Sequence, residues 1–372
     1  MTSRSQRLIG LETEYAIRVK TEPFSSAPPR SHRDVYESIC AVLRLRLPVA
    51  AANVTEAAKI GWFLGTGGAV WYESLFPTAG VGLIEGATPE CRGVRSLLAC
   101  QRAQDRLLSE AAQECGVSLL KNSHDRAGNT YGAQENYEFT LATGRQLRWW
   151  KAGCLCIILP LAILFHIIAI IGVCILLLLN PVGALIHRLR CTWLHDEAKR
   201  QQSHEFWIGR PGDTLHSGYD LPLGGFMGRP LLWLARVAAF PVSCATLLLL
   251  QITRLRHINR SLTAFLCTRM LYSGAGRVAR NGSFLMAEKA EAIWSVCGLP
   301  EFFRPMLSIG QFVKPALTIT RFSELLGSKQ RIQVALGDSN LCEEAEFLRV
   351  GTTLLVLDLI DANPDLPLPQ LR

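Results

Sequence analysis

The sequence predicts an α+β fold interrupted by a transmembrane helical hairpin, and three patterns support this prediction. Apolar and polar residues alternate in Ile9–Tyr15 and in Arg331–Leu336, which is typical of strands with one buried face. A helical pattern with paired leucines follows Cys91. The stretch Cys154–Leu179 then runs for 26 residues without a formal charge. Strands at both ends of the chain, with helices between them, are typical of the α+β class.

The first predicted strand carries two carboxylates on one face. Glu12 and Glu14 alternate with Leu11, Thr13 and Tyr15, so one face suits a core and the other carries bare acid. Neighbouring carboxylates repel each other unless a cation or a polarised substrate lies beside them. A solvated strand face is the alternative, because exposed carboxylates are common. This strand by itself leaves both interpretations open.

The next elements follow from turn signals and periodicity. Gly65–Gly68 reads as a turn, 69–74 as a strand, and a Pro/Gly loop extends to Gly82. The segment Leu83–Cys91 then leads into an amphipathic helix. Its apolar positions are Leu97, Leu98, Leu107 and Leu108.

Two later segments end in residues able to hold a metal or a nucleotide. Lys121–Tyr137 contains a glycine turn that feeds a strand ending in Glu135, Asn136 and Tyr137. The period-2 strand Arg331–Leu336 runs into 337–340, Gly-Asp-Ser-Asn.

Together, five ordered blocks resemble the Pup ligase and Pup deamidase (depupylase) family, the proteasome accessory factor A group. The blocks are Gly10–Tyr15, Leu83–Cys91, Lys121–Tyr137, Phe265–Val278 and Arg331–Ile360. The resemblance implies a carboxylate–amine ligase fold like that of glutamine synthetase: an antiparallel sheet cradle that holds ATP and Mg²⁺. In such enzymes ATP phosphorylates the C-terminal glutamate of a protein tag for attack by a lysine, whereas the deamidase branch hydrolyses an amide. The sequences at 88–90 and 273–278 resemble the deamidase branch more than the ligase branch.

Site residues are carried over from the family position by position. The resemblance places metal ligands at Glu12, Tyr72, Glu85, Glu135 and Gln333. It places ATP contacts at Gly10, Leu11, Glu14, Ala87, Thr88, Tyr137 and Arg331. These residue types suit the chemistry, because Mg²⁺ prefers hard oxygens and an arginine fork neutralises phosphoryl charge.

Three departures from the family pattern bear on activity. Val70 and Ser74 stand where the family has an arginine and a catalytic aspartate, and a serine hydroxyl stays protonated at neutral pH. Glu73 is the candidate general base, and in a regular strand we expect it to face away unless a bulge re-aims it. Gln333 replaces a histidine and is a poorer ligand. The chain stops at Arg372, before the family's C-terminal domain, which indicates a truncated or stripped-down member.

The middle of the chain predicts a membrane insertion. Cys154–Leu179 exceeds the roughly 20 residues that span a bilayer. A buried core helix is the alternative interpretation. A second, weaker span, Leu231–Ile252, contains Arg236 and Pro241. The predicted domains are a first cradle part (1–145), an insertion (146–257) with helices near 153–179 and 231–252, a second cradle part (258–363) and a tail (364–372).

Topology follows from the requirement that both cradle parts join one sheet, which needs two crossings. Basic flanks favour the catalytic part on the cytoplasmic face; they are Arg145, Arg148, Lys151, Arg254, Arg256 and Arg260. No N-terminal signal peptide is visible, which fits an internal anchor. The net charge of +8 comes without a nucleic-acid-binding motif, so a bilayer surface or an acidic tag is the expected partner rather than nucleic acid. The 12 cysteines show no zinc spacing and indicate reduced thiols.

The predicted function is therefore ATP- and Mg²⁺-dependent chemistry on a glutamyl carboxylate or amide of a Pup-like tag, in a proteasome-linked pathway. The alternative is a catalytically impaired family member that serves as a membrane-tethered adaptor binding nucleotide or tag. Ser74 keeps that alternative open. A small transporter is disfavoured, because only two spans are predicted and neither is rich in polar residues.

Overall fold

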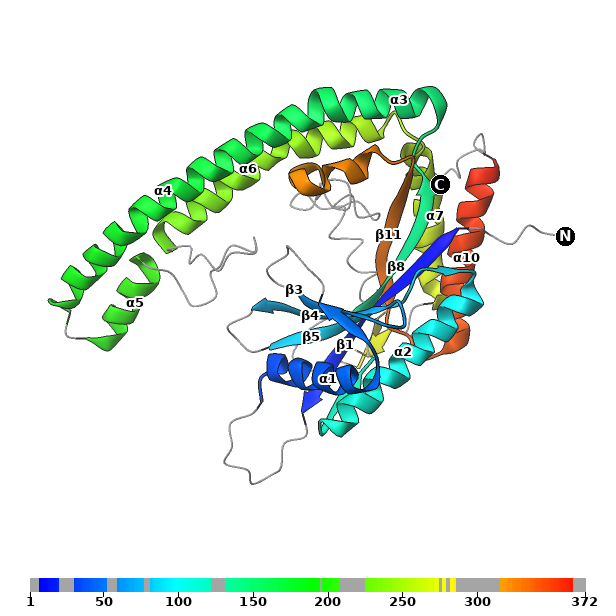
Figure 1. The fold of residues 1–372 in the computed structure, drawn as a ribbon, viewed down its shortest axis with the longest axis horizontal. Coiled ribbons are helices and arrows are strands. Elements are labelled where there is room, and N and C mark those ends of the chain that lie inside the picture. The colour runs from blue at the N-terminus through cyan, green and yellow to red at the C-terminus, as the bar shows by residue number, and fades with distance from the viewer. Residues whose placement is uncertain are drawn as a thin grey trace.

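A nine-stranded antiparallel sheet forms the centre of the molecule (Figure 1). The computed structural model describes residues 7–19, 30–51, 59–76, 81–121, 131–194, 196–207, 225–273, 276–278, 282–285 and 315–363. The main strand order is β11-β8-β1-β5-β4-β3-β2, and the short strands β6 and β7 pair with β1. The strands are β1 (Leu8–Val19), β2 (Val49–Ala51), β3 (Lys59–Leu64), β4 (Ala69–Phe76), β5 (Val81–Ala87), β6 (Cys91–Arg92), β7 (Val117–Leu120), β8 (Gly132–Thr140) and β11 (Lys329–Asp338). A separate two-stranded ribbon joins β9 (Arg277–Val278) to β10 (Phe284–Leu285).

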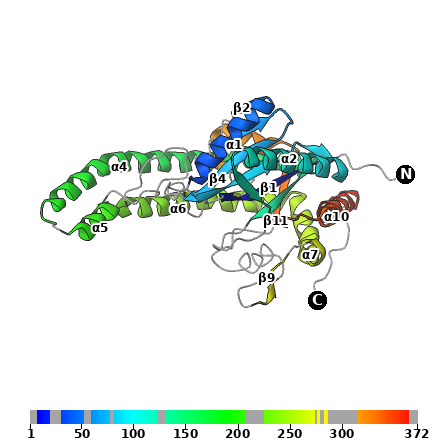
Figure 2. The ribbon, with the colours of Figure 1, turned by 90° about the horizontal axis from the view of Figure 1, so that it is seen from below.

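Helices cover one face of this sheet. They are α1 (His32–Arg46), α2 (Val94–Glu114), α7 (Leu255–Ser273) and α10 (Glu343–Ala362). The alternation of β1 dictates this arrangement, since Ile9, Leu11 and Tyr15 are at most 3 % exposed on the helix side. Figures 1 and 2 show the helices gathered beside the sheet rather than interleaved with its strands. The predicted α+β class is confirmed, with an antiparallel sheet.

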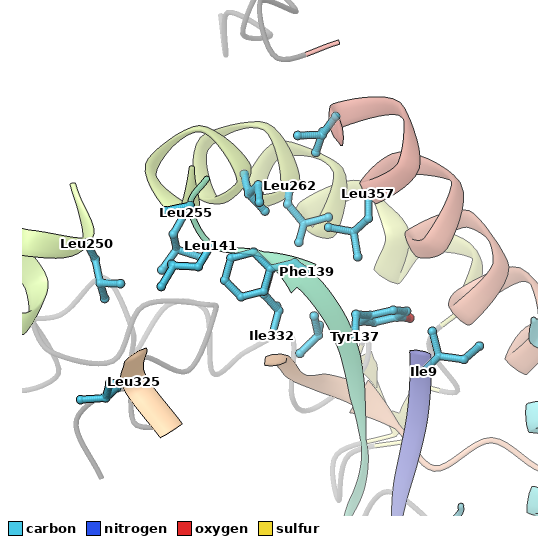
Figure 3. Packing of buried hydrophobic residues seen from close by; sticks show 14 of the residues in the cluster. Ile9, Tyr137, Phe139, Leu141, Leu250, Leu255, Leu262, Leu325, Ile332 and Leu357 are labelled. Carbon is cyan, nitrogen blue, oxygen red and sulfur yellow. The ribbon is translucent and has the colours of Figure 1, made fainter. Parts of the chain in front are cut away.

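Two apolar cores lie between the helices and the sheet. Under α1 and α2, the core includes Tyr36, Ile39, Val70, Tyr72 and Ile84. Under α7 and α10, aromatic and aliphatic side chains from β1, β8 and β11 meet leucines of both helices (Figure 3). That core includes Ile9, Tyr137, Phe139, Leu262, Ile332 and Leu357.

The sheet joins distant parts of the chain, as the predicted topology requires. Strand β11 pairs with β8 from Lys329 opposite Thr140 to Asp338 opposite Gly132. A β-bulge interrupts this register between Val334 and Gly337. Segments before and after the apolar insertion therefore lie in one sheet.

The insertion folds as a long helical hairpin that projects away from the sheet (Figure 1). Its first arm is continuous through α3 (Gly144–Gly153), the π-helical segment η2 (Cys154–Ile158) and α4 (Leu159–Cys191). Pro160 lacks an N–H and its ring crowds the preceding turn, which is consistent with the wider π turn immediately before it. The second arm is α6 (Gly225–Leu250), and α5 (Glu197–Trp207) lies at the far end. The first arm extends beyond the predicted 153–179 at both ends, and the second begins before the predicted 231–252 and ends two residues earlier.

The base of the hairpin belongs to the core of the cradle. Trp150, Cys154 and Ile158 of the first arm, with Val242 and Leu250 of the second, are at most 2 % exposed within the same apolar core as Phe139. The Trp150 indole N–H also donates to the Leu325 carbonyl at 2.6 Å, in the 3₁₀ segment η4 (Ile319–Leu326). The predicted boundaries at 146 and 257 therefore cut through packed structure. The predicted tail, 364–372, lies outside the described residues.

Candidate functional site

The face of the sheet opposite the helices carries a continuous polar surface. Cross-strand register places Gln333 of β11 opposite Asn136 of β8, which lies opposite Gly10 of β1. Two residues further along β1, Glu12 lies opposite Gln134 of β8 on one side and Ala87 of β5 on the other. Directly paired residues share a face, so these side chains share one surface.

This surface is hollowed into a cleft of about 850 Å³. Six of the seven predicted ATP contacts line it: Gly10, Leu11, Ala87, Thr88, Tyr137 and Arg331. The predicted metal ligand Glu12 lines it as well. The seventh predicted contact, Glu14, is not among the lining residues. A nucleotide-sized hollow therefore lies where the family resemblance places ATP.

Glu12 is the best-positioned acidic group of the cleft. Asn136 donates to Glu12 Oε1 at 3.1 Å, and the Gln333 amide donates to Oε2 at 3.4 Å. The Arg331 guanidinium approaches Oε1 at 3.5 Å, with its own side chain 54 % exposed. These contacts hold the carboxylate in place while it stays 21 % exposed to the cleft. Gln333 therefore acts as a hydrogen-bond donor to Glu12. An amide NH₂ group suits this role better than it suits metal ligation, because it has no lone pair to offer a metal.

Glu14 and Glu85 form a cross-strand pair of buried carboxylates. They lie directly opposite each other in the β1–β5 register, and they are 7 % and 1 % exposed. Glu14 accepts hydrogen bonds from the Gly132 backbone N–H at 2.7 Å and from the Gln134 amide at 3.3 Å. Like charges paired this way destabilise a sheet, and a bound cation relieves the repulsion. Glu14, predicted as an ATP contact, lies opposite the predicted metal ligand Glu85, so the two carboxylates are placed to share one cation.

The expected orientation of Glu73 is wrong in the structure. Trp71 lies opposite Glu85, and Glu73 lies opposite Leu83, so Glu73 shares the face of Glu85 and Glu14 without any re-aiming. The bulge in β4 comes after Glu73, between Glu73 and Phe76. The expectation failed because it placed Val70 and Ser74 at the site, whereas Val70 is fully buried in the core under α1 and α2. Gly61 leaves room for the Trp71 ring, since a Cβ there would lie 1.7 Å from a ring carbon.

Tyr72, a predicted metal ligand, points to the opposite side. It is 5 % exposed in the core under α1 and α2, with its ring centroid 5.6 Å from that of Tyr36. Neighbouring strand residues point to opposite faces, so Tyr72 and Glu73 cannot both face the carboxylate pair.

Glu135, also a predicted metal ligand, faces the helix side and lies in an ion network. The guanidinium of Arg269 on α7 contacts Glu135 Oε2 at 2.7 Å, and Arg349 on α10 contacts Oε1 at 3.4 Å. All three residues are 1 % exposed. Burial raises the pKa of the Tyr137 phenol, which donates to Glu135, well above its ordinary value, and the Glu135 charge adds to the effect. Both carboxylate oxygens of Glu135 therefore lie beside guanidinium groups on the helix side of the sheet, away from the cleft.

Thr88 and Tyr137 line the cleft in a different way than predicted. The Thr88 hydroxyl accepts from the Leu11 N–H at 3.0 Å, while the Thr88 N–H donates to the Leu11 carbonyl at 2.9 Å. These two hydrogen bonds of Thr88 hold the end of β5 against β1. Tyr137 is 1 % exposed and turns its ring into the core (Figure 3), so it borders the cleft through its backbone.

The charges lining the cleft favour a metal-complexed nucleotide over bare phosphates. Four carboxylates, Glu12, Glu90, Glu138 and Glu324, outnumber the two cations Lys329 and Arg331. Within the described ranges, no three acidic, histidine or cysteine side chains converge closely enough to hold a metal by themselves. Mg²⁺ commonly uses one or two carboxylates and completes its shell with phosphates and waters. Glu12, Glu14 and Glu85 fit that need, whereas Glu135 and Tyr72 do not.

Several cleft residues were missed from the sequence. Phe63 and Trp71 form an edge-to-face aromatic pair, with ring centroids 5.8 Å apart, along one wall. Glu138 was passed over, and Asn136, which the sequence offered as able to hold a metal or a nucleotide, was given no assigned contact because the family motif drew attention to Glu135. The alternation of β8 could have found them, since Gln134, Asn136 and Glu138 share one face.

Comparisons with known proteins find relatives of part of the chain. The Pup–protein ligase of Mycobacterium avium (strain 104) is 33 % identical over 111 residues, which is 29 % of this chain and 23 % of the relative. The Pup–protein ligase of Mycolicibacterium smegmatis gives the same identity and coverage. The aligned stretch thus spans less than a quarter of these relatives.

Two solved structures are also similar to the chain. One is the complex of the prokaryotic ubiquitin-like protein Pup with its ligase PafA: 18 % identity, TM-score 0.47, covering 97 % of this chain and 47 % of that one. The other is PafA in complex with ADP: 18 % identity, TM-score 0.40, covering 94 % and 50 %. The family model described as Pup-ligase protein matches residues 7–372. The chain belongs to the Pup-ligase family.

Proposed function

We propose that this protein carries out ATP- and Mg²⁺-dependent chemistry on a glutamyl carboxylate or amide of a Pup-like tag. One observation carries the proposal: Glu12, Glu14 and Glu85 lie on the same face of the sheet as a nucleotide-sized cleft. Membership of the Pup-ligase family supports the choice of substrate. Tagged proteins of a proteasome-linked pathway are the corresponding partners.

The register assigns a role to each part of the face. The cleft over Gly10, Glu12 and Ala87 would hold the nucleotide, with Trp71 and Phe63 along one wall. Trp71, which lines the cleft, lies opposite Glu85, so the Glu14–Glu85 pair adjoins the cleft. Mg²⁺ held by Glu12 of the cleft together with Glu14 and Glu85 would neutralise phosphate charge. Arg331, at the cleft margin, offers a guanidinium fork to phosphate oxygens.

Glu73 is the proposed general base. It is two residues from Trp71 along β4, about 7 Å further from the nucleotide cleft, on the same face. In this position its carboxylate can accept a proton from a tag-bound nucleophile, either a lysine amine in ligation or a water in deamidation.

The adaptor alternative rests on a specific observation. The family's aspartate position is Ser74, and the family's tyrosine position is the buried Tyr72. If Glu73 does not serve as base, the chain binds nucleotide or tag without turnover.

Glu73→Gln decides between these readings. We expect wild-type protein to hydrolyse ATP when Mg²⁺ and a Pup-like peptide are present, and Glu73→Gln to lower kcat at least 100-fold with ATP affinity unchanged. Glu37→Gln on the exposed surface of α1 is the control and should match wild type. Wild-type protein that binds ATP without turnover, together with activity gained by Ser74→Asp, would establish the adaptor. Wild-type turnover unaffected by Glu73→Gln would remove the assigned base.

A further inference from the structure

The hairpin of α4 and α6 has the reverse of the packing expected in water. Large aliphatic side chains face outward along the whole first arm: Ile170 is 62 % exposed and Leu178 is 73 % exposed. The second arm does the same at Trp233 (69 %) and Leu248 (71 %). Soluble helices bury such residues and expose charged ones, so these surfaces need an apolar environment.

Small residues fill the contact between the two arms. Gly153 packs against α6 so closely that a Cβ would lie 2.6 Å from a Leu249 methyl carbon. Ala162 is fully buried, Gly172 is buried, and Thr246 on α6 is fully buried. The Thr246 hydroxyl is satisfied within its own helix, donating to the Val242 carbonyl at 2.8 Å. Small residues inside and large ones outside are typical of helices that pack in lipid, where burying aliphatic groups between helices brings no gain.

The first arm is long enough and free enough of charge to span a bilayer. Residues 152–187 contain no Lys, Arg, Asp or Glu, and as a helix they extend for about 54 Å against a hydrocarbon thickness of about 30 Å. Only 12 % of its most apolar 18-residue stretch is buried, so it is not the core helix of a soluble domain. Its position in mid-chain, from Gly144, separates it from a leader sequence.

Polar anchors flank this run at both ends. Trp149, 59 % exposed, and Lys151 lie at the end near the sheet, and Arg188 and Arg190 lie at the far end. Tryptophans and basic residues at these positions suit the headgroup regions of a bilayer. A second copy of this chain would leave many outward residues uncovered, because they cover a broad face of the arm rather than one narrow stripe.

We propose that α4 and α6 span a lipid bilayer as a two-helix hairpin, with the sheet on one side and α5 on the other. The basic flank between Arg145 and Lys151, together with Arg254 and Arg256, favours the cytoplasmic face for the sheet. The hairpin would also fix the cleft beside the membrane surface. Trp150 at its base contacts Leu325, whose neighbour Glu324 lines the cleft. This inference concerns the hairpin alone and does not depend on the proposed activity.

Native thiols test the proposal without mutation. Cys174 is exposed on α4 near the middle of the uncharged run, and Cys342 is exposed next to α10 on the sheet side. The full chain is inserted into phosphatidylcholine vesicles, washed with carbonate, floated, and treated with a membrane-impermeant maleimide. We expect carbonate-resistant flotation, with Cys342 reacting at least 100-fold faster than Cys174, because thiolate does not form in hydrocarbon.

Lysine substitutions provide a second, independent part of the test. Ile167→Lys/Ile170→Lys/Ile171→Lys places three charges at outward positions near the middle of the span and should abolish flotation. Leu185→Lys/Leu189→Lys is the matched control at the far end, where lysines reach the interface, and it should float like wild type. Release of wild-type protein by carbonate, equal labelling of Cys174 and Cys342 in floated vesicles, or flotation of the triple variant would each overturn the proposal. A lipid-free dimer with protected Cys174 would assign the surface to a second copy instead.

Discussion

Substitution of Glu135 on β8 and of Glu12 on the adjacent β1 should affect different properties, because we assign Glu135 a structural role and Glu12 a binding role. Glu135→Gln removes a charge from between Arg269 and Arg349, both 1 % exposed. Removing one partner of a buried ion pair typically costs about 3–5 kcal/mol of unfolding free energy. At roughly 2–4 °C per kcal/mol for a domain of this size, the melting temperature should fall by about 10 °C.

Glu12→Gln should behave in the opposite way. Its contact to Arg331 is 3.5 Å long, and the Arg331 side chain is 54 % exposed, so the pair contributes about 0–1 kcal/mol to stability. The melting temperature should shift by no more than about 3 °C. Loss of a hard-oxygen ligand should instead weaken Mg²⁺-dependent ATP binding at least 30-fold.

Both variants are measured by thermal unfolding in detergent and by ATP titration with and without Mg²⁺. The control is Glu110→Gln, which removes an exposed partner of Arg46 and should change neither quantity. If Glu135→Gln keeps its melting temperature and loses Mg²⁺-dependent binding, then Glu135 is a metal ligand, as the family resemblance implied. The face assignment of β8 would then be wrong.

Two further predictions concern the base of the hairpin and the buried thiols. Trp150→Phe removes the indole N–H that donates to the Leu325 carbonyl, so the free energy of unfolding should fall by about 1–3 kcal/mol. Trp149→Phe, at the exposed neighbouring position, is the control and should have no effect. Equal losses of stability in both variants would contradict the role of this hydrogen bond. Burial raises the pKa of the Cys91 thiol to about 12, so at pH 8 only about 10⁻⁴ of it is thiolate. Iodoacetamide should therefore leave Cys91 intact while it alkylates the exposed Cys342. Rapid alkylation of Cys91 in the folded protein would refute its burial.

Much of the fold was determined by the sequence alone. The alternation in Ile9–Tyr15 and Arg331–Leu336 identified β1 and β11, because a strand with one buried face needs period-2 residues. The uncharged run identified the long helix, although not its full length. The positions of Gly10, Glu12, Ala87 and Arg331 at one cleft followed from the family resemblance.

The tertiary structure decided which side of each strand faces the cleft. On β4 and β8, polar groups occur at both parities, so periodicity could not tell Glu73 from Tyr72 or Asn136 from Glu135. The partners that settle the choice are distant in the chain: Arg269 is 134 residues from Glu135, and Tyr36 is 36 residues from Tyr72. Register and helix packing are non-local, and a shift of one residue exchanges every side chain between core and cleft. The sequence therefore determined the strands and the apolar hairpin, and only the folded sheet decided which carboxylates are bound by buried arginines and which remain on the open face.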